Sequence, residues 1–132
     1  MKQKYITICA GGVDIPAVLW GEPSGKLLLE VHGNLSNKED DAVKILAEEA
    51  VKRGYQALSF DLPQHGERAG EDGYMCVPWN CVSDLAAVHQ YACRLSGEIS
   101  LFACSIGAFF SLLAYGNCTL RKSFFLSPVV NI

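Results

Sequence analysis

The stretch that decides the fold of this 132-residue chain runs from Glu98 to Tyr115 and reads EISLFACSIGAFFSLLAY. Its first seven residues form an apolar run typical of a buried strand, and the run after Ser105 is apolar on most faces, as in a buried helix. A serine on a sharp strand-to-helix turn has a strained backbone, so the residues two before and two after it must be small. Ala103 and Gly107 meet that requirement. The stretch therefore predicts a strand, a tight turn that presents Ser105, and a helix.

Strands and helices alternate on the amino-terminal side of this stretch. Residues 4–10 and 15–20 alternate enough to form an antiparallel hairpin, and strands are also predicted at 26–31, 56–60 and 122–127. Helices are predicted after the capping residue Asn37, ending at Gly54, and from about Cys81 to Leu95. Such alternation indicates right-handed βαβ units. The predicted fold class is α/β, a three-layer αβα arrangement whose mostly parallel sheet starts with the hairpin, in a single domain of residues 1–132.

Composition excludes several classes of function. Half of the residues are hydrophobic and the net charge is -3, so the chain can bury a core and has no basic footprint for nucleic acid. Residues 101–116 are apolar but interrupted by serine and glycine, and they are shorter than the roughly 20 residues that a membrane span needs. The amino-terminal segment lacks the apolar core of a signal peptide. We therefore expect a cytoplasmic location, no membrane span and small-molecule partners.

The six cysteines contain no C-x-x-C pair and no Cys/His spacing typical of zinc, so neither a metal nor another cofactor is expected. Most of them lie in apolar segments, as buried thiols do. Only Cys76 and Cys81, in a loop with Pro78 and Trp79, are candidates for a disulfide or a metal site. Reduced thiols are the expectation, because the cytoplasm keeps thiols reduced.

Three polar segments follow strands whose carboxyl ends should meet at one edge of the sheet, where ligands of open parallel sheets bind. They are His32-Gly33-Asn34-Leu35, residues 61–68 and the Ser105 turn. Acyl transfer needs N–H donors aimed at a developing oxyanion. Ile106, directly after the serine, can supply one, and Asn34 or Leu35 can supply the second. These segments predict an acyl-transfer site with Ser105 as the nucleophile.

Taken together, the segments resemble the α/β-hydrolase superfamily, particularly its bacterial esterase, lipase and serine-aminopeptidase-like branch. The resemblance covers nearly the whole chain: the hairpin, Val31-His32-Gly33, the elbow at Ser105, and DLPQHG at residues 61–66, which is similar to the family's D-x-P-G-H-G segment. Ala103 replaces the first glycine of G-x-S-x-G, and Gln64 replaces a common glycine. The resemblance implies an ester or amide substrate and an acyl-Ser105 intermediate, without a cofactor.

The resemblance also implies an acid and a histidine after the serine, yet no His, Asp or Glu follows Ser105. Without a base, a serine hydroxyl is a weak nucleophile. The family gives His32 a structural role, and His89 is expected at the surface or half-buried on the second long helix. His65 is the better candidate for a base, although in the family it orders its loop. Asp61 is expected to tie that loop together.

We therefore expect a truncated α/β-hydrolase fold, the amino-terminal core of a serine hydrolase, incomplete or inactive as a 132-residue chain. The alternative is a non-catalytic α/β-hydrolase-like protein or fragment that associates, for example as a homo-oligomer, through its last strand. That strand would be a sheet edge with an exposed apolar flank. A nonfunctional remnant of an interrupted gene is a third interpretation. The substrate stays open, because the lid and acyl pocket of such enzymes come largely from later segments.

Overall fold

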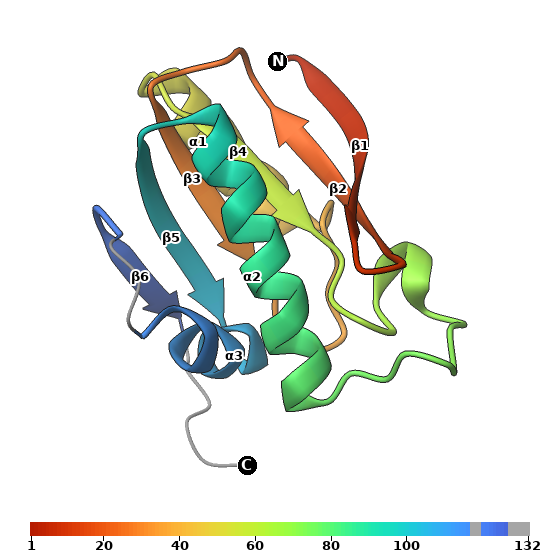
Figure 1. Cartoon of the computed structure of the whole chain (residues 1–132). Helices are drawn as coiled ribbons and strands as arrows, with labels where there is room; N and C mark the ends of the chain where they lie inside the picture. Colours follow the sequence, from red (N-terminus) through yellow and green to blue (C-terminus); the bar gives the residue numbers. More distant parts are fainter. Residues whose placement is uncertain (117–119, 127–132) are drawn as a thin grey trace.

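Strands alternate with helices after an opening hairpin, as Figure 1 shows for the computed structural model. The structure describes residues 1–116 and 120–126. The elements in chain order are β1 (Gln3–Ala10), β2 (Val13–Trp20), β3 (Lys26–Val31), α1 (Asp41–Lys52), β4 (Gln56–Phe60), the short 3-10 helix η1 (Gly66–Arg68), α2 (Pro78–Leu95), β5 (Glu98–Cys104), α3 (Ile106–Tyr115) and β6 (Ser123–Leu126). The predicted α/β class is confirmed.

The strands form one mixed sheet in the order β1-β2-β4-β3-β5-β6. β1 pairs antiparallel with β2, and β2 pairs antiparallel with β4. The pairs β3–β4, β3–β5 and β5–β6 are parallel, with Val31 opposite Ala103 and Cys104 opposite Leu126. The carboxyl ends of these four strands therefore lie at the same edge of the sheet (Figure 1).

A helical layer covers each face of the sheet. Successive side chains of a strand point to opposite faces, so apolar strands place side chains on both faces that helices then bury. α1 packs on one face through a small cluster that consists of Val18, Trp20, Val43, Ala47 and Ala57. α2 and α3 cover the other face and enclose the larger core (Figure 1). The alternation is visible within β2, where Val18 belongs to the α1 cluster and Leu19 to the larger core. The expected three-layer arrangement is confirmed.

The predicted start of α1 is wrong. Asp40 caps the helix, and its carboxylate accepts hydrogen bonds from the N–H groups of Ala42 and Val43 at 3.0 and 3.3 Å. Asn37, the predicted cap, instead accepts the N–H of Glu39. Between the two residues, the N–H of Lys38 donates to the carboxylate of Asp61 at 2.9 Å.

The start of α2 also differs from the prediction, and the predicted end of β6 is not tested. α2 begins at Pro78, three residues before Cys81, because proline has a helical φ and its missing N–H is not needed in the first turn. β6 is described to Leu126, and its predicted last residue, Ser127, lies outside the described residues.

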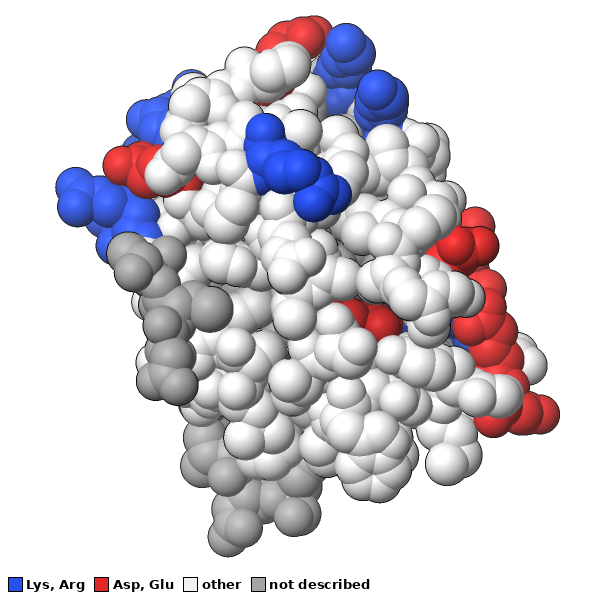
Figure 2. Space-filling view, in the orientation of Figure 1, with Lys and Arg blue, Asp and Glu red and all other residues white. Residues whose placement is uncertain are grey.

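Charged side chains are unevenly distributed over the face of the molecule that Figure 2 shows. Figure 2 shows few of them over α2 and α3, whereas acidic side chains gather along the edge formed by the loop between β4 and α2.

Among the described helices, none has the length and hydropathy that crossing a membrane would require.

Candidate active site

Ser105 occupies the sharp turn between β5 and α3. Its backbone has φ 55° and ψ -124°, a region that a residue with a side chain rarely adopts. Its N–H donates to the carbonyl of Leu126 at 2.9 Å, so β6 holds one side of the turn. A Cβ on Gly107 would overlap the carbonyl oxygen of His32. Glycine is thus required where the sequence predicted a small residue.

A second turn lies beside this one, after β3. The N–H of Ser36 donates to the carbonyl of Gly33 at 3.2 Å, and Leu35 within the turn has φ 64°. A Cβ on Gly33 would lie 3.0 Å from the Cβ of Ser105, so the two turns touch. The hydrogen bond that closes this turn does not use the N–H groups of Asn34 and Leu35. Ile106 is the first residue of α3, and the first N–H groups of a helix have no partner within the helix. The predicted oxyanion donors therefore belong to neighbouring turns.

His32 holds the β3 and β4 loops together. The N–H of Leu62 donates to its Nε2 at 3.0 Å, so the proton is on Nδ1, which donates to the carbonyl of Gly33 at 2.7 Å. Burial favours the neutral ring and lowers the pKa of His32 to about 4. Both nitrogens are engaged, which is the structural role that the resemblance implied.

His65 also connects the two loops. Its Nδ1 lies 2.9 Å from the carbonyl oxygen of Pro63, and its Nε2 lies 3.4 Å from the side-chain oxygen of Asn34. The ring centroids of His65 and His32 are 5.1 Å apart. Within the described residues, no hydrogen bond joins His65 to Ser105. The role of His65 as a base remains a prediction.

His89 lies at the opposite end of α3 from the serine. Its ring centroid is 5.3 Å from that of Tyr115, the last residue of the helix, and a ten-residue helix is about 15 Å long. The side chain is half-buried, as expected, and burial lowers its pKa. His89 is therefore remote from Ser105.

The carboxylate of Asp61 organises the loop after β4. It is fully buried and accepts the Lys38 N–H at 2.9 Å, the Lys38 ammonium at 2.9 Å and the Glu67 N–H at 3.0 Å. A Cβ on Gly66 would overlap this carboxylate. The expectation that Asp61 ties its loop together agrees with these contacts. The burial of Lys38 was not predicted, because its partner Asp61 is 23 residues away in the sequence.

Arg68, at the end of η1, ties the middle of the same loop to its start and to α2. Its Nη1 donates to the carbonyl of Asp61 at 3.0 Å and to the carboxylate of Asp84 on α2 at 2.7 Å. Tyr74 donates to the other oxygen of Asp84 at 2.9 Å. Arg68 and Asp84 are both almost completely buried. The loop is thus anchored at the sheet edge and at α2.

A cavity of about 190 Å³ opens beside Ser105 on the face of the sheet that carries α1. Its lining includes Glu30, whose side chain is only 2% exposed. Neither carboxyl oxygen of Glu30 has a hydrogen-bond partner among the described residues. Burial, with the nearby charge of Asp40, raises the pKa of Glu30 well above its usual range. Sequence reasoning missed this residue, although a carboxylate inside the apolar run LLLEV was the available signal.

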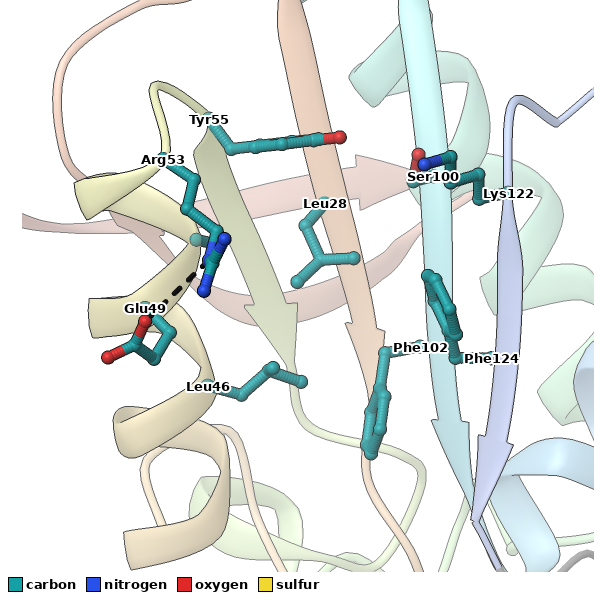
Figure 3. A pocket seen from close by; sticks show the side chains of 10 residues that line it. Leu28, Leu46, Glu49, Arg53, Tyr55, Ser100, Phe102, Lys122 and Phe124 are labelled. Carbon is teal, nitrogen blue, oxygen red and sulfur yellow. Dashed lines mark ion pairs between the residues drawn. The ribbon is translucent and has the colours of Figure 1, made fainter.

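A larger hollow lies elsewhere. It has a volume of about 490 Å³ and separates α1 from β5 and β6 (Figure 3). Leu28, Phe102 and Phe124 supply apolar walls, and the Glu49–Arg53 ion pair lies on the α1 side. The hollow shares Phe102 with the smaller cavity but does not include Ser105. Ser105 therefore lines the smaller cavity. Within the described residues, no group of three or more His, Cys, Asp or Glu side chains is arranged to hold a metal ion.

Comparisons with known proteins identify the fold. No protein-family model and no curated protein matches the sequence. Among solved structures, an esterase from Butyrivibrio proteoclasticus with bound ferulic acid superposes with a TM-score of 0.82 at 19% identity, covering 95% of this chain and 53% of its own. An esterase from Pyrococcus furiosus superposes with a TM-score of 0.82 at 22% identity, covering 96% and 49%. The chain has the α/β-hydrolase fold.

A third neighbour of this α/β-hydrolase fold is a serine hydrolase without a lid from Xanthomonas campestris. It superposes with a TM-score of 0.80 at 17% identity and covers 96% of this chain and 62% of its own. The fold inferred from the resemblance is confirmed. The chain spans about half the length of the first two neighbours.

Proposed function

We propose that Ser105 is the nucleophile of a hydrolase that acts on a small ester or amide, in a cytoplasmic location. The observation that carries the proposal is the strained Ser105 turn, in contact with the Gly33–Ser36 turn. The fold neighbours, which are described as esterases and as a serine hydrolase, support the same reaction class.

The proposed reaction follows from the positions of the two turns. Oγ of Ser105 attacks the carbonyl carbon, and its proton passes to a base. The carbonyl oxygen becomes an oxyanion, which accepts hydrogen bonds from the N–H of Ile106 and that of Asn34 or Leu35. The leaving alcohol or amine takes up a proton, and the acyl-Ser105 ester that remains is hydrolysed by water.

Activation of the serine is the step that this chain performs poorly. No hydrogen bond joins Oγ of Ser105 to a described residue, and both His32 nitrogens are occupied. A general base must come within hydrogen-bond reach of the proton that it removes. We therefore propose that the 132-residue chain has little or no turnover.

Phosphonylation by a fluorophosphonate, followed by peptide mass analysis, tests both parts of the proposal. We expect slow labelling of Ser105, accelerated by added imidazole that supplies the missing base, and no labelling of this site in Ser105→Ala. Ser24→Ala, which changes a serine that instead contacts Gly54, is the matched control and should label like the unchanged chain. Failure of imidazole to promote any labelling of Ser105 would refute the nucleophile.

Two other outcomes would correct the details. Rapid labelling without imidazole would contradict the proposed inactivity. If that rapid labelling disappeared in His65→Ala, His65 would be the base.

A second candidate function is association through β6 without catalysis. β6 is an edge strand of the described sheet, and the side chains of Phe124 and Leu126 are 54% and 55% exposed. Apolar side chains on an edge strand favour pairing with a second chain.

A further inference from the structure

Two thiols lie together at the start of α2. Cys76 ends the loop after β4, Cys81 is in the first turns of the helix, and their sulfur atoms are 3.7 Å apart. Cys81 is fully buried, whereas Cys76 is partly exposed. We propose that Cys76 and Cys81 form a redox-active dithiol that a small disulfide, such as glutathione disulfide, oxidises to an intramolecular disulfide. This inference goes beyond the proposed hydrolysis and does not depend on it.

The geometry permits the bond with a small movement. A disulfide has a sulfur–sulfur distance of about 2.05 Å. The two sulfur atoms, which are 3.7 Å apart, must therefore approach by about 1.6 Å. Cys76 lies outside the helix, just before the extended residue Val77. Its N–H donates to the side chain of Gln64 at 2.8 Å, which positions it against the loop of the candidate active site.

The surroundings assign different roles to the two thiols. The hydrogen bond from Cys81 stabilises the Cys76 thiolate, and His65 and Arg68 add to this effect against the opposing cost of burial; together they lower the pKa of Cys76 to about 7. The amino-terminal end of a helix also favours a thiolate. The same hydrogen bond and burial raise the pKa of Cys81. The exposed thiol is therefore the attacking group, and the buried thiol is the resolving group.

The reaction balances in two exchange steps. The Cys76 thiolate attacks one sulfur of glutathione disulfide, the glutathione S–S bond breaks, and one glutathione leaves as a thiolate and takes up a proton. Cys81 then loses its proton and attacks the Cys76 sulfur, which releases the second glutathione. The two protein thiols are oxidised by two electrons, and one glutathione disulfide is reduced to two glutathione molecules.

Equilibration of the 132-residue chain in glutathione buffers of increasing oxidised fraction, with alkylation of the remaining thiols, tests the proposal. Trypsin releases residues 69–94, which also contain Cys93, so the measurement uses a Cys93→Ser background. We expect this peptide to lose the mass of two hydrogen atoms and to escape alkylation, and dithiothreitol should reverse both changes. Cys9, which is exposed and apart from this pair, should remain alkylatable or carry glutathione.

Single variants separate the two roles. Cys81→Ser should stop at a stable glutathione adduct on Cys76, whereas Cys76→Ser should leave Cys81 without an adduct because it is buried. Alkylation of both thiols at every buffer ratio would overturn the proposal. So would a glutathione adduct that persists on Cys76 while Cys81 is present, or an adduct that forms first on Cys81.

Discussion

At the scale of single residues, Glu30 is a buried carboxylic acid without a hydrogen-bond partner among the described residues. A carboxylate that loses water without gaining a hydrogen bond favours its protonated form, and burial raises the pKa of Glu30 accordingly. His32, two residues further along the chain, is buried with hydrogen-bond partners for both of its polar atoms. The neutral form of its ring therefore suffices.

Glu30→Gln should stabilise the protein in a pH-dependent manner. The folded pKa of Glu30 is raised, so the folded state binds its proton more tightly than the unfolded chain does. Below the unfolded pKa of about 4.3 the carboxyl is protonated in both states and imposes no ionisation cost. As the pH rises above that value, the unchanged protein loses stability that the glutamine variant retains.

Urea unfolding of both proteins between pH 4 and pH 8 measures this difference. The advantage of Glu30→Gln should grow with pH, whereas Glu48→Gln, which changes an exposed carboxylate on α1, should show no comparable trend. An advantage that shrinks with rising pH would contradict the assigned direction of the pKa.

At the scale of elements, close contact between α3 and β3 positions the serine turn. Gly107 in the first turn of α3 lies against the backbone at the end of β3, where no Cβ fits. Contact at this distance explains how a short helix can hold Ser105 in its strained conformation.

Gly107→Ala should lower the free energy of unfolding by about 1–3 kcal/mol, the usual cost of forcing an extra carbon into a packed site. The gain in helix propensity of up to about 1 kcal/mol opposes this loss, so the net change measures the overlap with His32. Gly97→Ala is the control, because a Cβ there meets no atom within 4 Å. Equal stability of the two variants in urea would show that α3 can move away without cost.

Local sequence patterns predicted the presence of the strands and helices more reliably than the residues at which they begin and end. The alternation of β1 and β2 and the apolar runs of β3 to β5 are properties of neighbouring residues, so their positions were predicted well. The start of α1 was not, because Asn37 and Asp40 are both good caps. Local pattern does not decide between them, and the Lys38 N–H that lies between them donates to Asp61, which is distant in sequence.

At the scale of the whole molecule, β6 is an edge strand of the described sheet and carries exposed apolar side chains. β6 pairs with β5 on one side, and its Phe124 also forms a wall of the hollow between α1 and β5 (Figure 3). Side chains of this type are stabilised when another chain covers them.

We expect the chain to self-associate through β6, with a solution mass above that of the 14.4 kDa monomer by light scattering. Phe124→Lys should shift the population towards the monomer. Leu113→Lys, on the exposed face of α3, changes an apolar side chain of similar exposure (53% against 54%) and should leave the association intact. A monomer at every concentration, or equal effects of the two variants, would contradict association through β6.

The amino-acid sequence alone determined the α/β class, the order of strands and helices, and the presence of Ser105 on a strand-to-helix turn. These properties depend on hydrophobic periodicity and on small residues at fixed spacing, which act between neighbours in the chain. Only the tertiary structure decided that both His32 nitrogens are engaged, that Glu30 is buried without a partner among the described residues, and that Cys81 is fully buried while Cys76 is partly exposed. Burial and hydrogen-bond partners depend on which distant segments fold against one another, and no local pattern specifies them.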